Sequence, residues 1–414
     1  MHFSEQLVTA VILTTLIGSY VIGNLSDFLN LLSLNPSLPA EFKDHYDRQK
    51  YEDSQSYLKA TTRFGFFTSS FDLAIILLFW FFKGFQYTDA FVRAFGFSSI
   101  VSGLLFIGIL LLLRTLVFLP FNIYSTFVIE EKFGFNKTSP RIFVMDLIKS
   151  IVLSCLLGGF LLALILFLLE FSGPYAWVYC WVASAVFLLA VQYIVPTWIM
   201  PLFNKFTPLE DGPLKEAIFK YADSIDFSLS NVFVMDGSKR SNKSNAFFAG
   251  FGKNKRIVLF DTLIENQTVD ELVAVLAHEM GHYKKQHIIK RIILAVFQMG
   301  LIFYLLSIFI SSESLFAAFY MENISVYAGL IFFGMLYSPI DFFLSIFFQA
   351  LSRKDEYEAD RFAATTLGES KSLVNALKKL SVHNLSNLTP HPFYVVLNYS
   401  HPPVLERIRA LKPL

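Results

Sequence analysis

The chain has 414 residues, of which 54% are hydrophobic and only 16% are charged, and its mean hydropathy is +0.52. Soluble domains carry about 25% charged residues, so this composition excludes a disordered chain, a coiled coil and a small disulfide scaffold, and it indicates a membrane protein that crosses the bilayer several times. The formal net charge of +1 provides no global positive field, so we expect no nucleic-acid partner.

Long apolar runs mark the predicted membrane spans, because a transmembrane helix needs about 20 mostly apolar residues. Seven segments meet this requirement, at residues 6–32, 64–84, 97–120, 143–172, 174–202, 290–311 and 325–350. The fourth and fifth spans meet at the tight turn Ser172-Gly173-Pro174. We therefore predict a mainly α-helical, polytopic membrane protein with about seven transmembrane helices.

The distribution of lysine and arginine in the connecting segments predicts the orientation. Basic residues are concentrated in four segments, at 33–63, 121–142, 203–289 and 351–414, whereas Arg93 is the only clear cation in the loops of the opposite side. The rule therefore places the N-terminus outside and the C-terminus in the cytoplasm. An odd number of spans requires the two termini to lie on opposite sides, as this orientation has them.

Two large segments share the cytoplasmic side and can meet in one small α+β domain. The first is typical of strands at 232–235, 245–249 and 256–260, followed by a helix at 268–287 that Thr268 can cap. The second is typical of helices at 354–367, 370–381 and 402–412. The predicted organisation is five spans in 1–202, the first half of the small domain in 203–289, two further spans in 290–350 and the second half of the domain in 351–414.

The helix predicted at 268–287 contains His278-Glu279-Met280-Gly281-His282, in which the two histidines are about one helical turn apart. Both imidazoles therefore project from one face and can bind the same Zn²⁺, while Glu279 can act as a general base on a water molecule. The motif carries this meaning only on a helix, which the pattern here predicts. The alternative is a pair of surface histidines on a solvated helix.

A catalytic zinc site usually has three protein ligands, so one more imidazole or carboxylate is needed. Glu356 is the candidate, because it follows the last predicted span and returns to the same side of the membrane as the histidines. Asp360 shares its helix face and can orient a ligand or pair with a cation. Asp355 and Glu358 are expected to form a solvated acidic face, although spacing alone does not exclude Glu358 as the ligand.

Several long strings besides the histidine motif carry a family resemblance: Leu119-Pro120-Phe121-Asn122, 130–138, 235–241, 244–248, 254–263 and Ser400-His401-Pro402-Pro403. The chain resembles the Ste24-type CAAX prenyl proteases, seven-span zinc metallopeptidases of the endoplasmic reticulum and inner nuclear membrane. The resemblance implies a zincin-like cytoplasmic domain with one zinc ion held by His278, His282 and Glu356, and Glu279 as the catalytic base. It also implies a large intramembrane chamber, which the sequence itself does not show.

The resemblance implies roles for three further residues. Asn245 and His401 match residues beside the scissile peptide bond, where either could donate to a developing oxyanion. Arg407 matches a residue that pairs with the carboxylate of Asp360. Taken alone, Asn245 is typical of a turn and His401-Pro402 of a helix start. The strand at 245–250 could pair with an extended substrate through main-chain hydrogen bonds.

The implied function is hydrolysis of isoprenylated CAAX proteins, which removes their last three residues. The implied partners are a peptide or protein with a prenylated C-terminus and membrane lipid. The enzyme would lie in the endoplasmic reticulum of a eukaryote or the inner membrane of a bacterium, where proteolysis of damaged membrane proteins is the alternative. A second alternative is a transporter or receptor with a structural zinc, but we expect no third imidazole or cysteine near the motif, and Cys155 and Cys180 lie in apolar runs.

Polar residues inside the predicted spans are costly in hydrocarbon and are expected to be functional or paired. Arg114, Asp146 and Lys149 lie near the cytoplasmic ends, where extension of the side chain to the interface explains them. Asp72 and Asp341 lie deeper. They are expected to face a watery interior or to form a hydrogen bond between helices.

Overall fold

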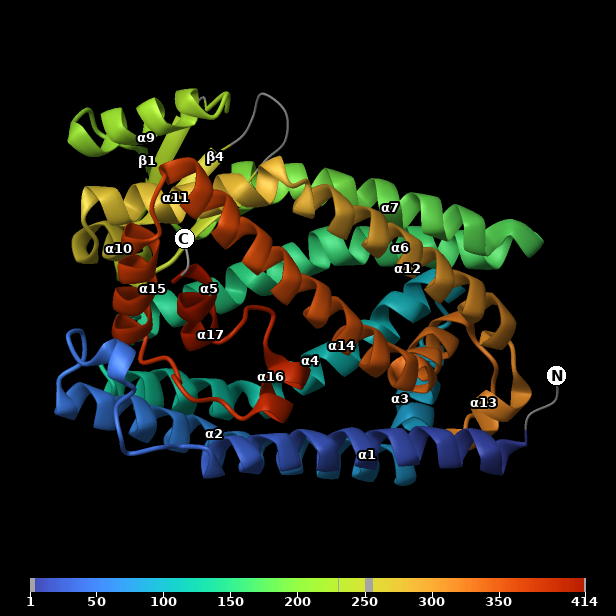
Figure 1. Ribbon diagram of the computed structural model, residues 1–414. Coiled ribbons are helices and arrows are strands. Elements are labelled where there is room, and N and C mark those ends of the chain that lie inside the picture. Colours follow the sequence, from blue (N-terminus) through green and yellow to red (C-terminus); the bar gives the residue numbers. More distant parts are fainter. Residues whose placement is uncertain (1–3, 230, 250–255, 413–414) are drawn as a thin grey trace.

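Long helices run side by side through most of the molecule, and a small domain with a β-sheet lies at one end (Figure 1). The computed structural model describes residues 4–229, 231–249 and 256–412. Within these residues, seven helical segments are long and apolar enough to cross a membrane. They are α1 (Glu5–Leu32), α2 (Arg48–Phe81), Ser99–Glu130 with α4 (Ser99–Tyr124), Pro140–Phe171 with α5 (Pro140–Leu153) and α6 (Gly159–Phe171), Gly173–Phe203 with α7 (Ala176–Ile194) and α8 (Met200–Phe203), α12 (His287–Phe309) and α14 (Val326–Leu367). The predicted fold class is confirmed.

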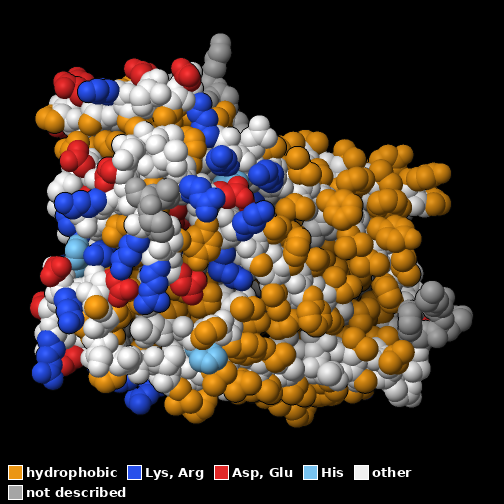
Figure 2. Space-filling model, viewed as in Figure 1, with side chains coloured by type: hydrophobic (Ala, Val, Ile, Leu, Met, Phe, Trp, Pro, Cys, Tyr) orange, Lys and Arg blue, Asp and Glu red, His pale blue; other side chains and the backbone are white. Residues whose placement is uncertain are grey.

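The surface divides into an apolar part and a charged part (Figure 2). Hydrophobic side chains cover the end of the molecule built from the long helices, and exposed examples are Phe160, Phe297 and Phe343. Lysine, arginine, aspartate and glutamate gather at the end that carries the small domain. An exposed apolar surface of this extent fits contact with lipid rather than with water.

Helix α14 differs from what the sequence predicted. A span at 325–350 and a separate helix at 354–367 were expected, but the structure has one continuous helix of 42 residues, Val326–Leu367. Residues 350–354 contain no glycine, proline or turn-forming pair, so nothing there ends the helix. At 1.5 Å per residue α14 is about 63 Å long, roughly twice the hydrocarbon thickness, and it therefore passes from the membrane into the small domain.

The end of the molecule opposite the small domain is closed by two short helices where loops were expected, α3 (Gly84–Arg93) and α13 (Glu313–Ala318). Aromatic rings fix this end. Phe319 stacks on Phe332 with ring centroids 4.0 Å apart, and the indole of Trp80 donates a hydrogen bond to the carbonyl of Ala318 at 2.7 Å. These rings are fully buried, which ties α2, α13 and α14 together.

A mixed four-stranded sheet lies within the described part of the small domain, in the order β1-β2-β4-β3. Its strands are β1 (Phe206–Pro208), β2 (Asn231–Met235), β3 (Ala246–Ala249) and β4 (Arg256–Phe260). Strands β2 and β4 are parallel, and β1 and β3 are antiparallel edge strands. Strand β1 was not predicted, because three residues ending in proline give no alternating pattern. Gly250, the last residue of the predicted strand 245–250, lies outside the described residues.

Six helices complete the small domain: α9 (Pro213–Ser224), α10 (Asp261–Asn266), α11 (Val269–Lys284), α15 (Lys371–His383), α16 (Pro392–Asn398) and α17 (Val404–Leu411). Helix α11 begins as predicted. Thr268 and Glu271 form a reciprocal capping box, and Lys379 of α15 donates to Glu271 at 2.6 Å. One core joins the two halves of the domain, with Leu259 and Ala277 packed in the same cluster as Ala363 and Leu411. The segments 203–289 and 351–414 therefore meet in one domain as predicted, while the domain boundaries stay a prediction.

Polar residues of the long helices are paired. Arg114 lies 3.2 Å from the carboxylate of Asp72, and Gln298 donates to Asp341 at 3.4 Å, so both deep aspartates bond between helices. Asp146 does not simply extend to the interface as expected, because Arg240 of the small domain binds both of its oxygens, at 2.7 and 2.9 Å. This fork anchors the segment between β2 and β3 to α5. Lys149 donates to the carbonyl of Leu202 at 2.7 Å.

Helix α11 approaches α14 closely at Gly281, within the histidine motif. A Cβ atom at Gly281 would lie 3.1 Å from a ring carbon of Phe362 and 3.3 Å from the Cα atom of Ala359. A larger side chain would therefore push the two helices apart.

We predict that Gly281→Leu destabilises the protein by about 1–3 kcal/mol, the usual cost of overpacking, and lowers its metal content. Thermal unfolding and metal analysis of the purified protein test this. The control is Gly108→Leu on α4, where no atom lies within 4 Å of the added Cβ. Equal melting temperatures and metal contents for the two variants would contradict the proposed close packing.

Candidate metal centre

Two histidines and one glutamate meet where α11 crosses α14. The Nε2 atoms of His278 and His282 lie 3.1 Å apart on one face of α11. The carboxylate of Glu356 on α14 lies 3.3 Å from Nε2 of His278 and 3.2 Å from Nε2 of His282. One donor atom from each residue lies within 4.8 Å of the others. The structure thus groups the three predicted ligands, and it places Glu356 rather than Glu358 between the histidines.

The chemistry of this group fits a bound cation. Glu356 is 2% exposed, and among the described residues its Oε2 atom forms no well-aligned hydrogen bond, only ionic contacts of 3.3 Å with Nε2 of His278 and 3.6 Å with Arg407. Burial opposes the charged form of His278, but its contacts with the carboxylates of Asp360 and Glu356 outweigh it and raise the pKa of His278 to about 9. The carboxylates around the imidazoles therefore favour a positive charge at this point. Two imidazole nitrogens and a carboxylate oxygen form a donor set that zinc accepts.

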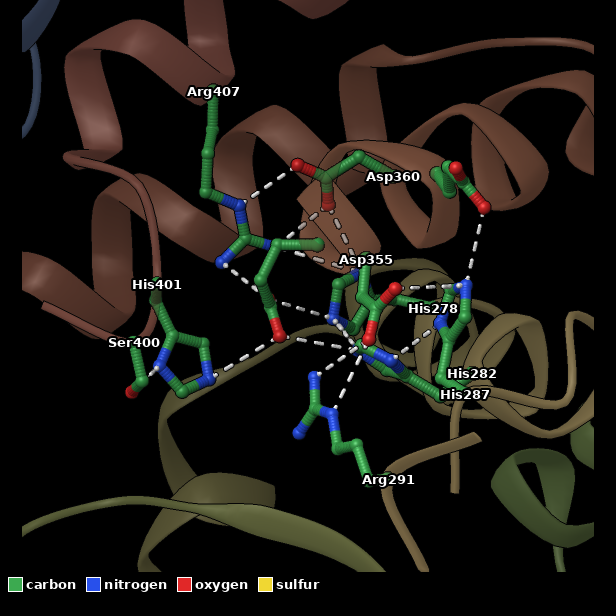
Figure 3. A network of polar contacts seen from close by, with 11 residues as sticks. His278, His282, His287, Arg291, Asp355, Asp360, Ser400, His401 and Arg407 are labelled. Carbon is green, nitrogen blue, oxygen red and sulfur yellow. Dashed lines mark hydrogen bonds and ion pairs between the residues drawn. The ribbon is translucent and has the colours of Figure 1, made fainter. Parts of the chain in front are cut away.

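Asp360 contacts His278 at Nδ1, the ring nitrogen opposite the one that faces Glu356, and Arg407 pairs with Asp360 (Figure 3). Arg407 on α17 donates to both oxygens of Asp360, at 2.8 and 2.6 Å. Oδ1 of Asp360 lies 2.9 Å from Nδ1 of His278, so Nδ1 can donate a proton to this carboxylate, and Nε2 would be the nitrogen left to bind a metal ion. Both Asp360 and Arg407 are buried, which is stable only because the two charges are paired.

His401 lies at the exposed rim of the cluster. Its Nε2 atom is 3.4 Å from Oε1 of Glu356, and its Nδ1 atom is 2.9 Å from the hydroxyl of Ser400 (Figure 3). The side chain is 64% exposed, so it can reach a bound molecule. Glu279 follows His278 on α11 and is partly buried, and desolvation raises its pKa.

Asn245 lies directly before edge strand β3. Its side-chain oxygen accepts from the N–H of Ala246 at 2.9 Å, and its carbonyl accepts from the N–H of Phe260 at 3.1 Å. Among the described residues, its hydrogen bonds therefore go to the sheet and none reaches the histidines. The side chain is exposed.

His287 is a site residue that the sequence analysis missed. Its Nδ1 atom lies 3.0 Å from Nδ1 of His282, and its Nε2 atom lies 3.2 Å from Glu358. The expectation that no third imidazole lies near the motif is therefore wrong. Residue Gln286, with a φ of 59°, separates α11 from α12 and turns His287 back toward His282. A third histidine five positions after the motif is the signal that could have indicated this contact.

The expected solvated acidic face on α14 is wrong for Asp355, while the side chain of Glu358 is 38% exposed but paired. Asp355 is 15% exposed and lies 3.2 Å from Arg291 and 3.6 Å from His287. Glu358 is the partner of His287 at 3.2 Å. Because α12 starts immediately beside this face, its basic residues neutralise carboxylates that the helix pattern alone leaves in water.

Comparison with known proteins accounts for both halves of the chain. Residues 28–205 match the family model described as CAAX prenyl protease N-terminal, five membrane helices, and residues 208–414 match peptidase family M48. CAAX prenyl protease 1 of Saccharomyces cerevisiae is 37% identical over 90% of this chain and 88% of its own length. The Arabidopsis thaliana homologue is 39% identical over 96% of this chain and 95% of its own, and the Homo sapiens homologue 36% over 91% and 89%.

The arrangement in space agrees with these matches. The crystal structure of Ste24p from S. mikatae superposes with a TM-score of 0.91 at 35% identity, and the match covers 98% of each chain. The chain belongs to the M48 family of CAAX prenyl proteases. As a member of this metalloprotease family it is a protease of the membrane, and the transporter and receptor alternative is not favoured.

We predict that His287→Ala weakens metal binding by about 10- to 100-fold, because contacts behind a ligand fix its ring and its tautomer. Titration of the metal-free protein with zinc in the presence of a competing chelator measures this affinity. His45→Ala is the control, since His45 is partly buried in the connection between α1 and α2, where its N–H bonds to the carbonyl of Phe42 and not to the histidine cluster. A zinc affinity equal to that of the unaltered protein would exclude the orienting role of His287.

Proposed function

We propose that this protein is a zinc endopeptidase that removes the last three residues from isoprenylated CAAX proteins at the membrane surface. The observation that carries the proposal is the group of His278, His282 and Glu356 on two crossing helices, in a chain that matches CAAX prenyl proteases over nearly its whole length. Relatives named CAAX prenyl protease 1 supply the substrate class. No feature of the structure favours proteolysis of damaged membrane proteins over this activity.

Zinc would be held by His278, His282 and Glu356, with a position left for substrate or water. When bound, it would polarise the scissile carbonyl and lower the pKa of a water molecule. Asp360 keeps His278 in the tautomer that this requires, and Arg407 keeps Asp360 charged and in place.

Glu279 is the proposed general base. It lies on α11 beside both histidines, where it would take the proton of the attacking water and later deliver it to the leaving amine. A carboxylate whose pKa is raised by burial suits both tasks, because it accepts a proton more readily than a carboxylate in water and can hold it until the amine leaves.

His401 and Asn245 are the proposed substrate contacts. His401 reaches the rim of the cluster and would donate to the oxyanion that develops on the scissile carbonyl. Strand β3 pairs with β4 on one side, and its other side is free of strands among the described residues. An extended substrate could therefore add to this edge, where Asn245 lies at the start of β3.

We propose that the small domain faces the cytoplasm and that the membrane is that of the endoplasmic reticulum. The excess of lysine and arginine on this side supports the orientation. Eukaryotic relatives support the compartment. Lipid is the expected partner of the apolar helices.

Glu279→Gln tests the assignment of the base. Because the amide cannot accept a proton, we expect the variant to keep its zinc and to lose cleavage by at least about 100-fold. Purified protein is incubated with a farnesylated CAAX peptide, the cut is located by mass, and zinc is measured separately. Glu265→Gln on α10 is the control, because Glu265 is exposed and lies outside the cluster.

Two results would contradict the proposed function. Normal cleavage by Glu279→Gln would contradict the assignment of Glu279 as the general base. Cleavage by the unaltered protein that persists after chelation of all metal would contradict the assignment of zinc as the catalytic metal. A cut at any bond other than the one before the last three residues would remove the substrate assignment.

Orientation is tested with an epitope added after the last residue. In sealed microsomes, whose outer face is the cytoplasmic one, we expect added protease to remove the tag without permeabilisation. A tag that is removed only after the membrane is permeabilised would invert the proposed orientation.

A further inference from the structure

A cavity of about 640 Å³ lies between α2 and α4, and none of the residues that line it belongs to the histidine cluster. Phe64 and Phe67 line it from α2, and Phe121 and Tyr124 line it from α4. The rings of Phe67 and Phe121 lie 5.7 Å apart. Ligand sites in proteins occupy about 300–1,000 Å³ and combine apolar walls with a few polar groups. The volume and the aromatic walls of this cavity therefore fit a hydrocarbon chain.

Two basic side chains, Arg63 and Lys132, also line this cavity. Both are exposed, and neither forms an ion pair with another residue within 4–229, 231–249 and 256–412. The ammonium group of Lys132 lies over the ring of Phe133, 5.5 Å from its centroid, and this contact supplies no negative charge. The cavity thus combines an apolar wall with two positive charges.

The acidic residues next to Lys132 are bound to other partners. Glu130 pairs with Lys243 of the small domain at 3.0 Å. Glu131 accepts a hydrogen bond from the side chain of Asn136 at 2.9 Å. Neither carboxylate therefore neutralises the two cations of the cavity. The contact with Lys243 also places this end of the cavity beside the small domain.

Both cations lie where the charged part of a membrane helix gives way to its apolar part. Residues 48–63 contain six charged side chains, the last of them Arg63, whereas residues 64–82 contain only Asp72. Residues 99–129 contain only Arg114, and Lys132 follows three positions later. The headgroups of phospholipids lie at this level, directly outside the hydrocarbon.

The cavity opens on the side of α2 and α4 that faces away from their ion pair. Asp72 of α2 lies 3.2 Å from Arg114 of α4. Arg63 precedes Asp72 by nine residues, about two and a half helical turns, so it projects from the opposite face of α2. Phe67 and Tyr124 are exposed on the cavity side. An exposed apolar face of helices that cross a membrane fits contact with lipid.

Helix α4 loses its regular hydrogen bonding at the level of the cavity. Pro120 lies inside α4, and the helix passes at its end into the π-helical turn η2 (Ser125–Glu130). Pro120, Val128 and Ile129 all line the cavity. Proline removes a main-chain bond, and π-helical turns are frequent at functional sites. This irregularity is an observation independent of the two cations, and it lies at the same place.

We propose that this cavity binds an anionic phospholipid from the leaflet next to the small domain. The phosphate would lie between Arg63 and Lys132, and an acyl chain would lie along Phe64, Phe67 and Tyr124. Basic pockets between transmembrane helices bind anionic headgroups, and arginine forms paired hydrogen bonds with phosphate. A zwitterionic lipid fits less well, because its own cation balances the phosphate. This binding does not depend on the proposed peptide substrate.

The test is native mass spectrometry of the purified full-length protein, titrated with phosphatidylserine or with phosphatidylcholine of the same acyl chains. We expect the first phosphatidylserine to bind about 25-fold more tightly than phosphatidylcholine, about fivefold for each cation. The double variant Arg63→Gln/Lys132→Gln should lose this difference. The charge-conserving variant Arg63→Lys/Lys132→Arg should retain it.

The matched control is Lys137→Gln/Arg141→Gln. Both residues are exposed, lie at the start of the span Pro140–Phe171 and do not line the cavity. This control removes one lysine and one arginine at the same end of the molecule, so the preference for phosphatidylserine should persist. Equal loss in the control and in Arg63→Gln/Lys132→Gln would overturn the proposal, and so would equal binding of the two lipids by the unaltered protein.

Two further arms identify the occupant. Glycerophosphoserine carries the same headgroup without acyl chains, and we expect it not to displace phosphatidylserine at equal concentration. Displacement would show an anion site without a lipid and would overturn the proposal. A dimer in the mass spectrum that only Arg63→Gln/Lys132→Gln abolishes would overturn it in favour of a second copy of this chain.

Thermal unfolding provides a readout that also reports whether each variant folds. A ligand that binds only the folded state raises the melting temperature. We therefore expect phosphatidylserine to raise it in the unaltered protein and in Lys137→Gln/Arg141→Gln, and to raise it less in Arg63→Gln/Lys132→Gln. The same increase in all three proteins would contradict a site at these two cations.

Discussion

The crossing of α11 and α14 is the contact on which the rest of the site depends. It brings a histidine pair and a glutamate from two distant segments within 4.8 Å of one another. Gly281 permits the close approach, and the unbroken length of α14 carries Glu356 out of the membrane to the level of the histidines. A break in α14 at the membrane surface would leave the third donor without a fixed position.

Charge neutralisation around the crossing explains why so many ionisable groups are tolerated there. The buried pair Asp360–Arg407 supports His278, while His287, Glu358 and Asp355 support His282 from the opposite side. Buried ion pairs add little net stability, because desolvation offsets their attraction. Their value here is positional, since each of them restricts the orientation of an imidazole.

Much of the fold could be predicted because long apolar runs and the 3.6-residue period are local signals. The seven spans, three strands and the capped helix with His278 and His282 follow from them. The sequence analysis divided α14 at residue 350, where its apolar residues give way to polar ones although the helix continues without a break. It missed strand β1 because that strand is only three residues long. His287, Asp355 and Glu358 were misjudged for another reason. Their partners lie on a neighbouring helix, and no local pattern shows which helices meet.

Helices α12 and α14 both reach from the apolar part of the molecule to the histidine cluster, so the proposed reaction centre would lie close to the membrane surface. A lipid-modified peptide could therefore present its bond to the site while its apolar chain stays out of water. The most direct test of the whole account is an anomalous difference map, recorded at the zinc edge from crystals of the zinc-loaded protein. We expect one peak about 2.0–2.1 Å from the Nε2 atoms of His278 and His282 and bonded to Glu356. A peak elsewhere, or none at these residues in active protein, would contradict it.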